Sequence, residues 1–215
     1  SVYVSVGSGN SGAGGDVVMM AGTSSFSAGG QIYLSGGTSS VSTGGRVLIQ
    51  SGFSSTQSSG VVGIQSADSG VNGVSGFVTM SSGASSNGNS GGLYLGSGQS
   101  SVGRGGVVSV TVGSGDSGAG GDVLVSAGGS SDTSLETASG GQVYLSGGTS
   151  ASQTGGRVYI GSGVSTAKSS GAIGVVTSAS GTAGVSGYLV MSSGSSLNGN
   201  SGSLYVGSGS SASGR

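Results

Sequence analysis

A fifteen-residue period runs through the whole chain and constrains its fold more than any other feature. Each repeat holds two aliphatic residues two positions apart, and fourteen successive repeats keep this pair without a polar exception. The first aliphatic column contains Val2, Val17, Ile32, Val47, Val62, Val78, Leu93, Val108, Val123, Val143, Val158, Ile173, Leu189 and Leu204. The second contains Val4, Met19, Leu34, Ile49, Ile64, Met80, Leu95, Val110, Val125, Leu145, Ile160, Val175, Met191 and Val206. A period this short is typical of one coil of a solenoid.

Glycine and serine are phased with the aliphatic pairs. Aliphatic residues at i and i+2 lie on one face of a β-strand. A corner glycine follows the pair, a serine column comes two residues later, and a closing glycine ends each repeat. Glycine suits such corners because it accepts positive φ and close backbone approach. The pattern predicts an all-β parallel β-solenoid of fourteen coils, with about 15 residues and two short strands per coil. One strand would carry the aliphatic pair on its inner face and the other the serines, which are either small filler or a hydroxyl ladder.

Seven repeats form a larger unit that occurs twice. The segment GSGNSGAGGDV from Gly7 returns as GSGDSGAGGDV from Gly113, and one extra residue enters after the fifth repeat and again after the twelfth. We therefore expect one continuous rod over residues 1–215, made of a unit at 1–106 and a unit at 107–215. The second unit has a five-residue insertion, which predicts a protruding loop near 132–138.

Composition narrows the function classes. The 215 residues include 53 glycines, five basic and six acidic residues, and neither cysteine nor histidine. Gly/Ser-rich chains are usually flexible, but the phased columns argue against disorder here. A net charge of -1 provides no positive electrostatic potential that would attract nucleic acid. The chain holds neither a long apolar run for membrane insertion nor a signal segment at its start, and its first residue suggests a piece of something longer.

Three motifs favour a structural interpretation over a catalytic one. The sequence G-x-G-x-x-G from Gly7 precedes a strand pattern rather than the helix that a dinucleotide site needs. Ser165 and Lys168 have the spacing of a penicillin-binding enzyme, but they fit a solvated turn, and the other unit has no matching lysine. Asp116 and Asp122 are compatible with a single weak ion site, but the chain lacks the repeated aspartates of a calcium roll. We expect no catalytic residue, metal or cofactor, and no enzyme activity.

Two sets of residues are candidate contact sites. Facing away from the predicted core are Tyr3, Val18, Tyr33, Leu48, Tyr94, Leu124, Tyr144, Tyr159, Val190 and Tyr205. Such an apolar stripe predicts lateral association, although a tyrosine ladder along the rod is the alternative. The position before the first aliphatic residue carries a polar ladder of Asp16, Gln31 and Arg46, and again of Asp122, Gln142 and Arg157. Stacked coils would place these residues about 4.8 Å apart and so hold the register. Uncapped ends predict end-to-end joining.

The repeat GGxVxLxSGxSSxxx, as in residues 44–56, resembles the short Gly/Ser-rich repeats of parallel β-solenoids in cell-surface filaments and adhesins. The head repeats of trimeric autotransporter adhesins are similar in length, but their alternation of serine, valine and alanine is not reproduced. The resemblance implies an extracellular or cell-surface structural role, with the chain itself or other filament subunits as partners. Exposed serine and threonine also leave O-linked glycans open. The alternative function is an adhesin stalk or an ice-binding solenoid, although the threonine columns are interrupted.

Overall fold

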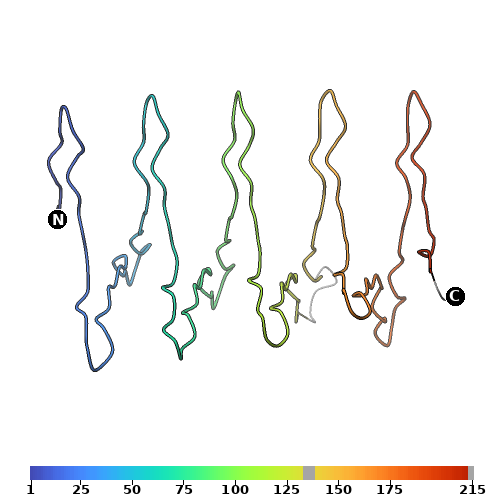
Figure 1. The fold of residues 1–215 in the computed structure, drawn as a ribbon, viewed down its shortest axis with the longest axis horizontal. Helices are drawn as coiled ribbons and strands as arrows, with labels where there is room; N and C mark the ends of the chain where they lie inside the picture. Colours follow the sequence, from blue (N-terminus) through green and yellow to red (C-terminus); the bar gives the residue numbers. More distant parts are fainter. Residues whose placement is uncertain (133–138, 213–215) are drawn as a thin grey trace. The chain divides into compact units, whose positions relative to one another are not determined.

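The computed structural model describes residues 1–132 and 139–212. These residues form neither helix nor β-strand (Figure 1). The predicted parallel β-solenoid with two strands per coil is therefore wrong. A strand exists only through backbone hydrogen bonds to a neighbouring strand, and in the described residues no such bond joins the aliphatic segment of one repeat to that of another. Apart from Asp132, the predicted loop near 132–138 lies outside the described residues.

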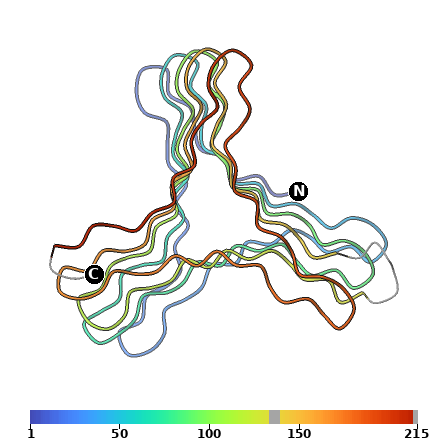
Figure 2. The same cartoon turned by 90° about the vertical axis from the view of Figure 1, so that its right-hand side faces the viewer.

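Each repeat instead consists of a loop and a linking segment. The loop runs from the corner glycine to the closing glycine, as at residues 7–15, 22–30 and 37–45, and the linking segment carries the aliphatic pair, as at 16–21 and 31–36. This alternation of loop and linking segment is visible from two directions (Figures 1 and 2). The chain divides into two compact units, Ser1–Ser109 and Val110–Arg215.

A glycine-to-glycine hydrogen bond closes many of the loops. The N–H of the closing glycine donates to the carbonyl of the corner glycine, as from Gly45 to Gly37 at 2.7 Å. In the second unit, Gly141 keeps this bond to Gly128 at 2.8 Å although the insertion lies between them. The loop is thus a local motif that does not depend on neighbouring repeats.

The length of the closing bond follows the size of the residue before the corner position, which we call the neck residue. The corner position is glycine in all but two repeats, where Ala67 and Ser178 take it. The bond is 2.7 Å with glycine, 2.8 Å with alanine, 2.9 and 3.0 Å with serine and 3.4 Å with valine at the neck. The neck residues concerned are, in that order, Gly36 and Gly147, Ala21 and Ala127, Ser162 and Ser51, and Val6. At two other necks, the hydroxyls of Ser66 and Ser97 donate to the closing glycine carbonyl, at 2.7 and 2.9 Å. A larger neck side chain therefore spreads the two ends of the loop.

Steric crowding explains the closing glycine in some repeats, although a Cβ on Gly91 or Gly187 would make only ordinary contacts. A Cβ on Gly45 would lie 2.7 Å from the nitrogen of Gly37, and one on Gly121 would lie 2.7 Å from a methyl group of Val112. Both distances are shorter than van der Waals contact allows. At Gly45 and Gly121, the two ends of the loop can approach only because the closing residue has no side chain.

The serine column shapes the tip of the loop. The Oγ atom of Ser24 accepts the N–H of Ser27 at 3.0 Å, and Ser39, Ser54, Ser100, Ser150 and Ser165 accept from the amide three residues ahead at 2.9 to 3.0 Å. Serine commonly closes turns in this way. The bonds of these six serines stay within one loop, so these side chains do not form a hydroxyl ladder between repeats.

No hydrophobic core forms within the described residues. Every described residue is exposed except Ala21, Gly36, Ser51, Ser54 and Ser66, which are half-buried. Four of these five are neck residues. These four necks are therefore among the most enclosed points of the described residues, and the aliphatic columns that were expected to point inward are open to solvent.

Candidate assembly surface

The aliphatic columns form one exposed face of the linking segments. The first column is about half exposed, with Ile32 at 47% and Val108 at 58%, and the second is more open, with Leu34 at 67%. A linking segment of six residues is too short to bury its own aliphatic pair. An exposed apolar surface of this kind usually marks an interaction interface in a soluble protein.

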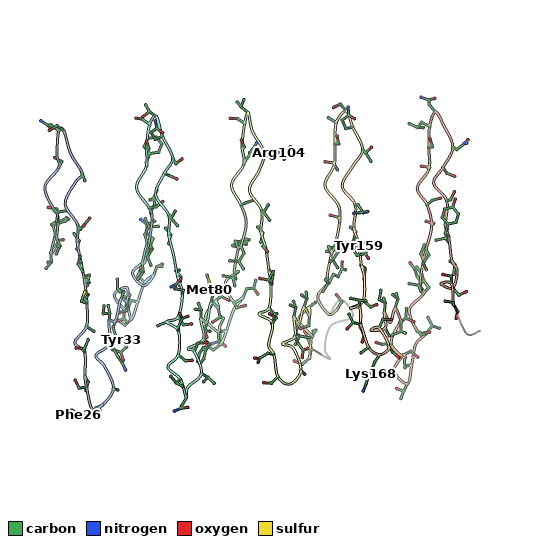
Figure 3. All side chains as sticks on the ribbon, viewed as in Figure 1. Phe26, Tyr33, Met80, Arg104, Tyr159 and Lys168 are labelled. Carbon is green, nitrogen blue, oxygen red and sulfur yellow. The ribbon has the colours of Figure 1, made fainter. Side chains whose placement is uncertain are left out.

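The tyrosine column lies between the two aliphatic columns and is more exposed still. Tyr94 is 93% exposed and Tyr159 is 78% exposed. The remaining predicted contact residues, Tyr3, Tyr33, Leu48, Leu124, Tyr144 and Tyr205, are exposed as well. Figure 3 labels Tyr33 and Tyr159, which lie on linking segments, and Phe26, which lies on a loop. Lateral packing through this column stays a prediction.

Polar residues accompany some of these tyrosines. The hydroxyl of Tyr33 donates to Oε1 of Gln31, and Tyr144 does the same with Gln142. The guanidinium of Arg157 lies 5.8 Å from the centre of the Tyr159 ring, within the range of a cation–π contact. All three pairs are two residues apart, so both side chains lie on the same side of an extended backbone. This pairing within one repeat was not foreseen from the sequence, although the i and i+2 spacing was the available signal.

The six residues of the polar ladder lie in successive repeats. Among the described residues, no hydrogen bond or ion pair joins Asp16, Gln31 and Arg46 to one another, and the same holds for Asp122, Gln142 and Arg157. Gln31, Gln142 and Arg157 contact tyrosines of their own repeats instead. The ladder between repeats stays a prediction.

The motifs that suggested chemistry lie in loops. Ser165 Oγ accepts the N–H of Lys168 at 2.9 Å, which makes this pair the predicted solvated turn. The first G-x-G-x-x-G motif spans most of the loop at 7–15, and its second copy ends at Gly118, where φ is 81°. Over residues 1–132 and 139–212, neither a pocket nor a group of three or more metal-binding side chains is found. A helix long and apolar enough to cross a membrane is also not found in that part.

Comparison of the chain with protein-family models, with curated proteins and with solved structures finds no match in any of the three.

Proposed function

We propose that the chain is a structural segment of an extracellular filament or surface appendage that works by associating with further chains. The observation that carries this proposal is the exposure of the same aliphatic face in repeat after repeat of both units. A catalytic protein concentrates its chemistry at one place. This chain distributes one surface evenly along its length.

The extent of exposed surface supports association. The chain exposes 21,211 Å² of surface. A folded monomeric protein of 19.7 kDa exposes roughly 8,600 Å². Much of the apolar part of this surface is arranged in periodic columns rather than scattered, so a partner with the same period covers it along its whole length. The hydrophobic effect then favours assembly.

The low charge fits a packed filament. Eleven charged residues among 215 leave the repeats nearly neutral, and chains with so little charge repel one another weakly. The extracellular location rests on the resemblance of residues 44–56 and their counterparts to the repeats of surface filaments and adhesins. At an extracellular location, the exposed serines in the loops are available for O-linked glycosylation.

Electron microscopy of the native material tests the proposal. Long polymers that antibodies against this chain decorate along their whole length are the expected result. Decoration of isolated short stalks would favour an adhesin, and a dispersed protein without polymers would reject a filament. The purified chain provides the second arm, because it should form fibrous particles without any other component.

A further inference from the structure

The backbone of the linking segments is left unpaired by the chain itself. In the described part of the molecule, every backbone-to-backbone hydrogen bond joins two glycines of a loop, and none involves residues 16–21 or their counterparts. A row of free N–H and C=O groups beside aliphatic side chains is a template for pairing with another segment. The linking segments therefore offer both hydrogen bonds and apolar contacts to a partner.

The corner glycines point to the same surface. Glycine takes the corner in twelve repeats, with Ala67 and Ser178 in the other two, and all twelve glycines have open space where a Cβ would be, with no atom within 4 Å. Positive φ does not explain them either, because the described glycines with positive φ are Gly118 and Gly184. Several closing glycines, by contrast, are crowded by their own chain, as at Gly45 and Gly156. No contact within the described part of the chain requires glycine at the corners. Close approach of the backbone of another chain would explain the repeated glycine.

The polar residues before the first aliphatic column fit another copy of this chain. With two copies parallel and in the same register, Asp16 would lie beside Asp16 and Arg46 beside Arg46, and like charges directly opposite are unfavourable. An offset of one repeat places Asp16 beside Gln31, and Gln31 beside Arg46. An offset of two repeats would pair Asp16 with Arg46 but leave Gln31 beside an apolar residue, whereas an offset of one repeat gives the amide a charged neighbour on each side. An offset of one repeat also matches Asp122, Gln142 and Arg157 in the second unit, where the insertion lengthens the step from Asp122 to Gln142 to 20 residues. An antiparallel copy that kept the aliphatic pairs together would instead place Asp16 opposite positions such as Met20 and Ser35.

We propose that linking segments of neighbouring copies lie side by side in parallel, offset by one fifteen-residue repeat, with the corner glycines at the contact. This arrangement rests on the self-association in the proposed function and specifies its geometry. The partner's aliphatic columns then cover those of the first copy, and the polar ladder forms between copies rather than within one.

The surface is large enough for such a contact. A stable interface needs about 800 Å² from each partner. The chain exposes 21,211 Å², more than twice the area of roughly 8,600 Å² expected for its mass. A single dimer interface would use a small part of this excess, so each copy has surface for more than one neighbour.

Disulfide cross-linking tests the offset directly, because the chain contains no cysteine of its own. The full chain is prepared as D16C, as Q31C and as the double variant D16C/Q31C, and each is oxidised after assembly. We expect the double variant to give a ladder of covalent multimers on a denaturing, non-reducing gel. Each single variant should remain mostly at the monomer position, because equal positions are one repeat apart in adjacent copies. Efficient dimers from the single variants would overturn the offset.

Two glycine variants test the contact without cysteine. Gly52→Ala adds a methyl group at a corner, and we expect the concentration needed for assembly to rise about tenfold. Gly63→Ala is the matched control, because Gly63 also has open space around it and its column holds tyrosine or leucine in other repeats. It should assemble like the unaltered chain. Equal assembly of both variants would reject the corner contact.

The two proposals fail differently. If the unaltered chain forms no multimers at any concentration, both the proposed function and the arrangement of copies are rejected. If the unaltered chain forms filaments while D16C/Q31C gives no more cross-linked product than the single variants, only the arrangement is rejected.

Discussion

Replacing the closing glycine Gly45 with alanine should open one loop and leave the others intact. The Cβ of the variant would lie 2.7 Å from the nitrogen of Gly37, so the ends of the loop must separate. Relief to an ordinary contact of 3.4 Å requires a shift of about 0.7 Å. The same shift would lengthen the closing bond from 2.7 Å to about 3.4 Å, which is the longest closing bond of the described residues, found at Gly15, and lies beyond the usual range for N–H to O hydrogen bonds. A backbone hydrogen bond contributes about 0.5–1.5 kcal/mol net, so its loss should raise the opening equilibrium about 2- to 12-fold.

Amide hydrogen exchange of the full chain measures this opening at one residue. We expect the N–H of residue 45 to exchange about 2- to 12-fold faster in Gly45→Ala than in the unaltered chain. The closing amides of other repeats, such as Gly30 and Gly156, should keep their rates, because each bond lies within its own loop.

Gly44→Ser is the matched control for this experiment. The position before the closing glycine is already serine in some repeats, as at Ser59 and Ser170, and a Cβ on Gly44 would make an ordinary contact of 3.4 Å with the carbonyl of Gly37. Exchange at Gly45 should therefore change little in this control. Equal rates in all three proteins, or equal acceleration in both variants, would refute the steric explanation of the closing column.

Two further variants probe the loop tip and the outer face. Ser39→Ala removes the acceptor for the N–H of Ser42, a bond of 3.0 Å, so exchange of that amide should rise roughly 2- to 12-fold, whereas Ser39→Thr, which keeps a hydroxyl, should restore protection. Tyr159→Asp places a charge in the tyrosine column and should raise the concentration needed for assembly, measured by sedimentation, at least about tenfold. Tyr159→Leu should assemble nearly normally, since Leu48 and Leu124 occupy the same column, and an unaffected Tyr159→Asp would show that the column is not an interface.

The period was readable from the sequence because it rests on local features. The corner glycine, the serine two residues later and the closing glycine mark the beginning, the tip and the end of each loop. Bonds such as that from Ser42 to Ser39 span three residues, so residue spacing alone carries the signal. The interpretation of the serine half as a strand failed because serine can bond to its own turn as readily as it fits a strand.

The pairing of the aliphatic segments was not predictable in the same way. The apolar pair Val17 and Met19 favours burial against other side chains. Two residues do not specify whether those side chains belong to the same chain or to another. Stacking within one chain was expected, and the described residues instead leave these side chains open.

The glycine columns illustrate the same limit. Sequence reasoning assigned positive φ to the corners, yet neither Gly37 nor Gly52 has it. The sequence treats corner and closing glycines alike. The structure distinguishes them: a side chain at Gly45 would collide with its own chain, whereas one at Gly37 would have open space around it.

The mass of the purified chain in solution tests the central claim most directly. Light scattering coupled to size-exclusion chromatography, over a range of concentrations, should give multiples of 19.7 kDa that grow with concentration, because the exposed aliphatic face is covered only by further copies. A single species of 19.7 kDa at every concentration, with amides of the linking segments strongly protected from exchange, would contradict the account. Such a result would mean that the chain covers its own aliphatic columns.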